Sequence, residues 1–258
     1  MNTPIWYPSA SPFEIPHILH QMESAPKHPV FGHLLLPEGE HDAPLPCVVA
    51  LHGSRGWGDH HHDHVANWLD AGIAVFRCHC FESRQVDEIV VDQMMVTHAM
   101  MLSDAFCALT LLCEDKRIDS QRIAISGWSL GGTVALYSAW EPIANALAPN
   151  GERFAAHMPF YPAAHMRPDI QRWSSAPILV LQGAIDDWTP AHFVTELAEI
   201  IRPHGAIIDV EIYDPFFSAE EINNVTEALE SDPQKLQSIN DTLETIYKLQ
   251  SKHVVSSV

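Results

Sequence analysis

The chain has 258 residues, a formal net charge of −19 at pH 7, 47% hydrophobic residues and 18% charged residues. This apolar content is enough for a hydrophobic core and excludes an intrinsically disordered chain, and the length fits one α/β domain. The acidic excess excludes binding to the phosphate backbone of nucleic acids, which needs clusters of Lys and Arg. We therefore expect no nucleic-acid partner.

The N-terminal sequence has neither the basic region nor the continuous apolar region of a signal peptide. No apolar run approaches the roughly 20 residues that a membrane-spanning helix needs. The 5 cysteines form no C-x-x-C pair, and an odd number favours free thiols over a disulfide framework. These features predict a soluble, cytoplasmic protein without a membrane partner.

In chain order, residues 1–29 are rich in Pro and Ser and lack periodicity, which predicts a surface arm. Short apolar runs bounded by Pro or Gly then predict strands. These runs are residues 30–36, 46–52, 73–78, 122–126, 153–161, 176–183 and 206–213. Apolar residues spaced three and four apart predict helices over residues 92–114, 131–147 and 191–202. The alternation predicts an α/β fold with a mostly parallel sheet and helices on both faces.

Residues 30–258 are expected to form a single domain, because internal repeats and low-complexity linkers are absent. The charged, helix-prone C-terminal segment is interrupted at Pro233 and predicts a surface helix followed by a tail helix. A tail helix of this kind is suited to docking at the interface of a homodimer.

The stretch Gly127-Trp128-Ser129-Leu130-Gly131 lies between a predicted strand and a predicted helix. In this context a Gly-x-Ser-x-Gly turn predicts a nucleophile elbow, which presents a serine hydroxyl at the edge of a sheet. The N-terminus of the following helix carries positive partial charge that favours an oxyanion. Ser129 is therefore the predicted nucleophile.

Two backbone N–H groups are expected to form the oxyanion hole of such a site. Leu130, directly after the nucleophile, supplies one, and Ser54, after the strand that ends in His52 and Gly53, supplies the other. His52 is expected to brace this loop rather than to act in catalysis. Trp57 and Trp128 adjoin the loop and the nucleophile and are expected to contact the substrate.

A catalytic acid is expected after a later strand, where ligand sites of α/β sheets gather. Asp186 follows the predicted strand that ends at Gly183 and is the first choice, with Asp187 as the alternative.

Together these stretches resemble the dienelactone hydrolase family of α/β-hydrolases. The matching blocks lie in order between about residues 30 and 215: LPCVVALHGSRG, AGIAVFRCHCFESR, ISGWSLGG, MPFYP and LQGAIDDWTPA. The resemblance implies a compact α/β-hydrolase fold without a large cap domain and hydrolysis of lactones or small esters by a Cys or Ser nucleophile, an Asp and a His. It also aligns Arg84 with an arginine that contacts a substrate carboxylate in some members, although a surface salt bridge is an equal alternative.

The sequence departs from the family pattern at two places. Ser218 stands where the family has its catalytic histidine after the last strand, and a hydroxyl cannot act as a base near neutral pH. His79 and Cys80 stand where the family has Asp followed by a small residue. The catalytic set is thus predicted as Ser129, Asp186 and Ser218, a triad without its usual base.

Other histidines could supply that base. His192, His204 and His253 follow Asp186 in the chain, but none is well placed. The histidines of residues 59–64 and His157 remain as candidates, although a structural role is the simpler interpretation of each.

The sequence predicts no metal and no cofactor. His60 and His64, one turn apart, could share a ligand, but three adjacent histidines on a helix diverge by roughly 100° each. Cys78 and Cys80 would lie on one face of a strand with His79 on the other, which argues against a metal clip.

Three functions remain open at this point. The first is a hydrolase of small esters or lactones, including carboxylate-bearing ones, through Ser129. The second is a lyase, isomerase or cyclase that stabilises an enolate in the same pocket, and the third is a binding protein or pseudoenzyme. Only the first assigns a covalent role to Ser129.

Overall fold

The computed structural model describes residues 3–213, and all structural statements below concern this part of the chain. Ser218, His253 and the predicted tail helices lie outside the described residues. The assignment of residues 30–258 to one domain therefore stays a prediction, as does the homodimer.

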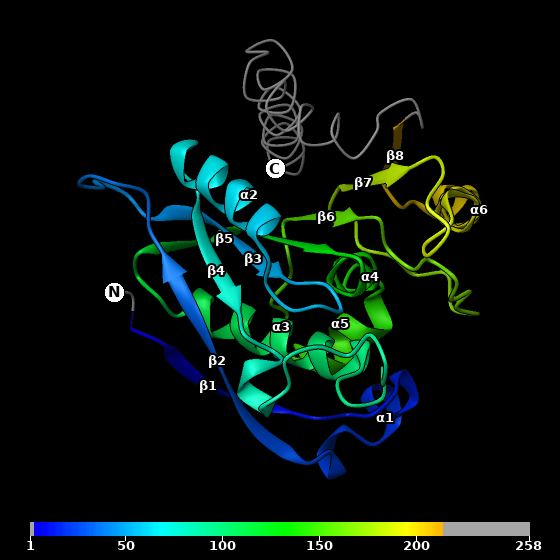
Figure 1. The fold of residues 1–258 in the computed structure, drawn as a ribbon, viewed down its shortest axis with the longest axis horizontal. Coiled ribbons are helices and arrows are strands. Elements are labelled where there is room, and N and C mark those ends of the chain that lie inside the picture. Colours follow the sequence, from blue (N-terminus) through cyan, green and yellow to red (C-terminus); the bar gives the residue numbers. More distant parts are fainter. Residues whose placement is uncertain (1–2, 214–258) are drawn as a thin grey trace, which may run out of the picture. The chain divides into compact units, whose positions relative to one another are not determined.

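An eight-stranded sheet in the order β1-β2-β4-β3-β5-β6-β7-β8 forms the centre of the described residues (Figure 1). The strands are β1 (Ile5–Ala10), β2 (Lys27–Leu35), β3 (Leu45–Leu51), β4 (Ala74–Cys78), β5 (Ile118–Trp128), β6 (Ala156–Phe160), β7 (Ile178–Gly183) and β8 (Ile208–Tyr213). β3 to β8 run parallel to one another, whereas β2 pairs antiparallel with both β1 and β4. The predicted α/β class and mostly parallel sheet are confirmed.

The helices cover the two faces of this sheet. They are α1 (Ile15–His20), α2 (Asp59–Asp70), α3 (His98–Cys113), α4 (Leu130–Tyr137), α5 (Glu141–Leu147) and α6 (Ala191–Ile201). Short 3₁₀ turns lie at η1 (Met22–Ser24), η2 (Glu82–Arg84) and η3 (Arg202–His204). Within residues 3–213, no helix has the length and apolar character required to cross a membrane.

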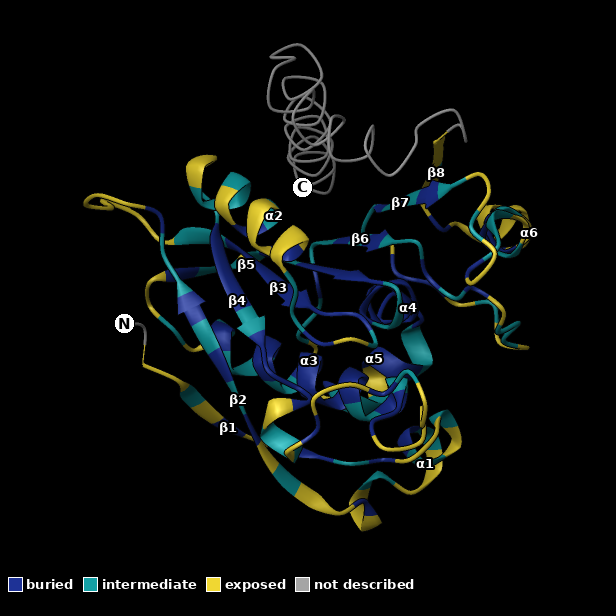
Figure 2. Ribbon diagram, viewed as in Figure 1, coloured by how far each residue is buried: buried dark blue, intermediate teal, exposed yellow. Residues whose placement is uncertain are grey.

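Apolar side chains form a cluster on each face of the sheet. Alternate residues of β3 show the division, since Val49 belongs to the larger cluster with α3 and α4, and Val48 belongs to the smaller one beneath α2. We call the smaller one the α2 cluster; its buried members are Val48, Ala50, Val65, Val75 and Trp128. The buried strands and helix α3 contrast with the exposed outer side of α2 (Figure 2).

Three elements differ from the sequence prediction. Residues 5–10 of the expected N-terminal arm form the edge strand β1 along β2. The helix predicted over residues 92–114 begins only at His98, where Thr97 caps it by accepting the Met100 N–H at 3.4 Å. The helix predicted over residues 131–147 is divided into α4 and α5, because Trp140 adopts an extended conformation before Pro142 in the first turn of α5.

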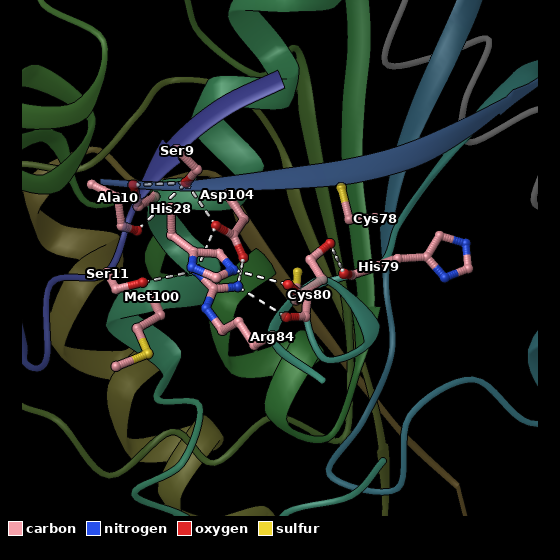
Figure 3. A network of polar contacts seen from close by, with 12 residues as sticks. Ser9, Ala10, Ser11, His28, Cys78, His79, Cys80, Arg84, Met100 and Asp104 are labelled. Carbon is pink, nitrogen blue, oxygen red and sulfur yellow. Dashed lines mark hydrogen bonds and ion pairs between the residues drawn. The ribbon is translucent and has the colours of Figure 1, made fainter. Parts of the chain in front are cut away.

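A buried ion pair links segments that lie far apart in the sequence (Figure 3). The Arg84 guanidinium donates to both Asp104 oxygens, with Nη1–Oδ2 at 2.7 Å and Nη2–Oδ1 at 3.0 Å. Ser9 of β1 donates to Asp104 at 2.6 Å, and Arg84 also donates to the Cys80 carbonyl at 2.9 Å. The pair therefore fastens β1 and the segment after β4 to α3.

This arrangement corrects both interpretations of Arg84. The Arg84 and Asp104 side chains are only 7% and 0% exposed, so the pair is not a surface salt bridge. Both terminal nitrogens of the guanidinium are engaged by Asp104, which leaves no fork to receive a substrate carboxylate.

Replacing Asp104 is expected to destabilise the fold strongly. Asp104→Asn leaves a buried, uncompensated guanidinium, which costs about 3–5 kcal/mol of unfolding free energy. Glu196→Gln is the control, because it breaks the Arg167–Glu196 pair, whose carboxylate is 56% exposed, and such surface pairs contribute less than about 1 kcal/mol. Urea unfolding of both variants measures the difference, and equal losses would contradict a clamping role for Asp104.

Candidate active site

The predicted nucleophile lies at a strained turn between β5 and α4. The backbone of Ser129 has φ 53° and ψ −111°. Residues other than glycine rarely adopt this conformation, which costs about 1–3 kcal/mol. The Ser129 N–H donates to the Phe160 carbonyl at 3.0 Å, and the Ser129 carbonyl accepts the Thr133 N–H at 2.8 Å. These bonds hold the turn in the geometry of a nucleophile elbow.

Close approach of neighbouring backbone explains the glycines that follow the serine. A Cβ added at Gly131 would collide with the carbonyl oxygens of Leu51 and His52, and one added at Gly132 would collide with that of Phe160. The elbow is therefore packed directly against the ends of β3 and β6, and only glycine fits there.

The two predicted oxyanion donors lie on either side of this contact. Leu130 is the first residue of α4, so its N–H has no partner within the helix. A Cβ added at Gly53 would lie 3.5 Å from the Ser129 Cβ, which places the loop after β3 beside the nucleophile. The Ser54 carbonyl accepts the Ile89 N–H at 2.9 Å, which braces this loop from outside.

A cavity of about 380 Å³ opens at this place. It brings together three of the predicted site residues, Ser54, Trp128 and Ser129. The remaining lining residues are Gly53, Arg55, Gly56, Gly58, His60, His61, Val90, Tyr161 and Trp188. The lining contains no Asp or Glu, and its one Lys or Arg side chain is the exposed Arg55.

Trp57, expected to contact the substrate, is instead half-buried in a structural position. Its indole N–H donates to the Cys78 carbonyl at 3.0 Å, and the Arg77 guanidinium lies 4.4 Å from the ring centroid. The side chain supports the loop between β3 and α2 and is absent from the cavity lining.

The predicted acid organises its own loop. Asp186 Oδ1 accepts the N–H groups of Trp188 and Thr189 at 2.9 and 2.8 Å, and Oδ2 accepts the Thr189 hydroxyl at 2.6 Å. Asp187, the alternative acid, is exposed. Within residues 3–213, no histidine hydrogen-bonds to Asp186 or to the Ser129 hydroxyl. The described part of the chain thus contains the predicted nucleophile and the predicted acid, but no histidine that is hydrogen-bonded to either of them.

Two histidines of α2, His60 and His61, line the cavity together with Ser129. The Nδ1 atom of His61 accepts the Gly58 N–H at 2.8 Å, and burial lowers the pKa of this ring to about 3. The neutral ring therefore carries its proton on Nε2 and is a donor rather than a base. His60 is exposed, although partial burial also lowers its pKa. His64 packs against Trp128, and burial lowers its pKa to about 4.

The other candidate histidines are structural. His52 Nδ1 lies 2.9 Å from the Gly53 carbonyl and braces the loop as expected. His157 Nδ1 lies 2.9 Å from the Ser138 hydroxyl, inside the core rather than at the cavity. Burial lowers the pKa of each ring to about 4, so both are neutral at pH 7.

The Cys78-His79-Cys80 stretch forms no metal clip. Both thiols are buried and burial raises their pKa, to about 12 for Cys78. His79 instead lies between His33 and Glu82, at 2.9 Å from each. Among residues 3–213, no three His, Cys, Asp or Glu side chains are placed to hold a metal.

Among the lining residues that sequence reasoning missed are Arg55, Tyr161 and Trp188. Arg55 directly follows the predicted oxyanion donor Ser54, and Trp188 lies two residues after the predicted acid Asp186. Their nearness in the sequence to these predicted site residues could have identified them. Tyr161 lies in the MPFYP block, but nothing in its sequence context marks it as part of a cavity.

Comparison with known proteins agrees with this geometry. The model of the dienelactone hydrolase family matches residues 32–245, most of the chain. The chain belongs to the dienelactone hydrolase family. Within residues 3–213, the sheet order and the elbow at Ser129 are those of an α/β-hydrolase fold.

Solved structures support the same fold at low identity. Apo esterase 2 of Thermogutta terrifontis is 15% identical, with a TM-score of 0.63 over 84% of this chain and 90% of that one. A candidate dienelactone hydrolase of Klebsiella pneumoniae subsp. pneumoniae MGH 78578 is 19% identical, with a TM-score of 0.58 over 85% of this chain and 90% of that one. At these identities the likeness establishes the fold alone.

One curated relative matches over a shorter region. The non-reducing polyketide synthase pkbA of Emericella nidulans is 27% identical over 145 residues, 51% of this dienelactone hydrolase family member. The match spans only 5% of the synthase. Its activity as a whole is therefore no guide to this chain.

The buried His157 predicts a loss of stability in mild acid. Its folded pKa of about 4 lies below the ordinary value of 6.5, so the unfolded chain binds a proton first as the pH falls. The stabilising contribution is complete above pH 6.5 and is lost toward pH 4, at about 1.4 kcal/mol per pH unit.

His157→Gln should reduce the pH dependence of unfolding free energy by that slope, measured by urea unfolding between pH 4 and pH 7. The exposed His20→Gln variant is the control. A wild-type slope in His157→Gln would contradict a neutral, buried imidazole.

Proposed function

We propose that this protein hydrolyses small esters or lactones, with Ser129 as the nucleophile. The observation that carries the proposal is the strained backbone of Ser129 at the wall of a cavity. Such strain persists where the surrounding structure enforces it, and it is concentrated at functional sites. The family assignment supports a hydrolase on independent grounds.

In the proposed reaction, Ser129 attacks the ester carbonyl and the N–H groups of Leu130 and Ser54 stabilise the oxyanion. One such donor contributes about 10²- to 10³-fold to kcat in serine hydrolases. Asp186 orders the loop that carries Trp188 at the cavity. The serine proton leaves with the alcohol, and water later releases the acid from the acyl-enzyme.

The cavity also favours an anionic substrate. Arg55 lines it without an ion pair to any of the described residues, and no carboxylate shares the lining. We therefore assign recognition of a substrate carboxylate to Arg55 in place of Arg84.

A second function is favoured by one observation. No histidine within residues 3–213 hydrogen-bonds to the Ser129 hydroxyl or to Asp186, so acylation there would lack its usual base. A lyase, isomerase or cyclase would use the same oxyanion donors to stabilise an enolate without a covalent step.

Labelling with a fluorophosphonate probe separates the two functions. The hydrolase proposal predicts stoichiometric labelling at Ser129, turnover of short esters, and loss of both in Ser129→Ala. A protein that turns over no ester and resists the probe would contradict it and favour the second function.

The Ser218→His variant tests the missing base. Restoring an imidazole at this position should raise esterase activity by about 10²- to 10⁴-fold, the usual contribution of a general base. Unchanged kcat in Ser218→His would contradict the alignment of Ser218 with the family histidine.

A further inference from the structure

Tyr161, directly after β6, has an unusual backbone conformation. Its φ is 36°, and Gln85 and Ser129 are the other two non-glycine residues with positive φ among residues 3–213. A bulky residue at positive φ is a genuine outlier, and such outliers gather at ligand sites. Tyr161 and Ser129 both line the cavity.

The turn that fixes the nucleophile also fixes Tyr161. The Tyr161 N–H donates to the Leu181 carbonyl of β7 at 2.8 Å, while the preceding carbonyl of Phe160 accepts the Ser129 N–H at 3.0 Å. The Tyr161 side chain packs against the α2 cluster. Its position is therefore set by β6, β7 and the elbow together.

The Tyr161 hydroxyl differs from those of the other described tyrosines. Tyr7 donates to Cys78 Sγ at 3.6 Å, Tyr137 to the Met166 carbonyl at 3.1 Å, and Tyr213 to Glu211 Oε2 at 3.2 Å. Within residues 3–213, nothing hydrogen-bonds the hydroxyl of Tyr161. Burial, and then the charge of Asp186, raise its pKa to about 12, so the phenol stays protonated at neutral pH.

Sheet order places Tyr161 on a definite side of the nucleophile. The Ser54 loop follows β3 on one side of β5, whereas Tyr161 follows β6 on the other, toward β7 and Asp186. An ester whose carbonyl oxygen points toward Leu130 and Ser54 directs its other substituents away from β3. The alcohol oxygen of the ester then lies toward β6.

We propose that Tyr161 is a substrate-contacting residue whose hydroxyl donates a hydrogen bond to the leaving-group oxygen of the ester. The inference rests on the proposed function, because it assigns a role in acylation of Ser129. In that step the Ser129 Oγ–C bond forms and the C–O bond to the alcohol breaks. The serine proton leaves with the alcohol, and Tyr161 retains its own proton while stabilising negative charge on the departing oxygen.

The role depends on how poor the leaving group is. The oxygen of an alkyl leaving group holds its developing negative charge locally until it receives the serine proton, and it gains most from a donor, whereas a nitrophenyl leaving group spreads this charge over the ring and gains little. A purely structural role for Tyr161 would affect both kinds of ester equally.

The test compares an ethyl ester and a p-nitrophenyl ester of the same short acid. Tyr161→Phe, which keeps the ring and removes only the hydroxyl, should lower kcat/KM for the ethyl ester by about 10- to 100-fold. For the nitrophenyl ester the decrease should be less than about 3-fold, since its leaving group needs little stabilisation. kcat/KM is the correct measure because it reports the acylation step for both esters.

Tyr137→Phe is the matched control. It removes the hydroxyl that donates to Met166, and Tyr137 does not line the cavity. Its ratio of ethyl to nitrophenyl activity should equal that of the wild type. The unfolding temperature of both variants shows whether any loss of activity reflects unfolding.

The outcomes separate this inference from the function on which it rests. Suppose that Ser129→Ala abolishes hydrolysis, but Tyr161→Phe lowers kcat/KM equally for both esters or for neither. Tyr161 then does not contact the leaving group. If Ser129→Ala leaves hydrolysis unchanged, or the wild type hydrolyses neither ester, the hydrolase proposal fails and this role fails with it.

Discussion

The backbone of Ser129 is held in a conformation that an isolated chain would avoid, and the rest of the site depends on that constraint. The neighbouring carbonyl of Phe160, the first turn of α4 and the glycine contacts with β3 and β6 supply the restraint. These contacts come from two strands of the sheet, β3 and β6, and from the helix α4. The strain is therefore supported by the whole core, and the Ser129 hydroxyl is presented where the cavity lies.

The same packing explains how the walls of the cavity arise. Because the elbow touches the end of β3, the loop with Ser54 must pass beside the nucleophile. Because it also touches the end of β6, Tyr161 emerges on the opposite side with a positive φ of its own. The two close contacts of the elbow thus position both the proposed oxyanion donor and the proposed contact to the leaving group.

The charged side chains that line the cavity differ in sign from the net charge of the protein. The chain carries a net charge of −19, yet the lining holds Arg55 and no carboxylate. The histidines near the cavity are neutral at pH 7 where burial has lowered their pKa, as for His61 and His64. The lining therefore offers the proposed anionic ester one guanidinium and no carboxylate, which favours its binding there.

Local patterns in the sequence were sufficient for the elbow and the parallel sheet, because glycine spacing and apolar runs act over a few residues. Side-chain partners distant in sequence were not accessible in this way. Arg84 was expected to contact the substrate, but it forms an ion pair with the buried Asp104 of α3. No local sequence pattern predicts that pair. Trp57 likewise turns to the Cys78 carbonyl of β4. Tyr161 was missed because its signal is a backbone angle that depends on contacts with β7 and with the elbow, both distant in sequence.

A crystal structure of the protein after reaction with a small phosphonate ester tests the central claim most directly. The account predicts phosphorus bonded to Ser129 Oγ, with the phosphonyl oxygen about 2.7–3.1 Å from the N–H groups of both Leu130 and Ser54. An adduct on another residue, or a phosphonyl oxygen that approaches neither N–H, would contradict the assignment of this strained turn as a nucleophile elbow with its oxyanion hole.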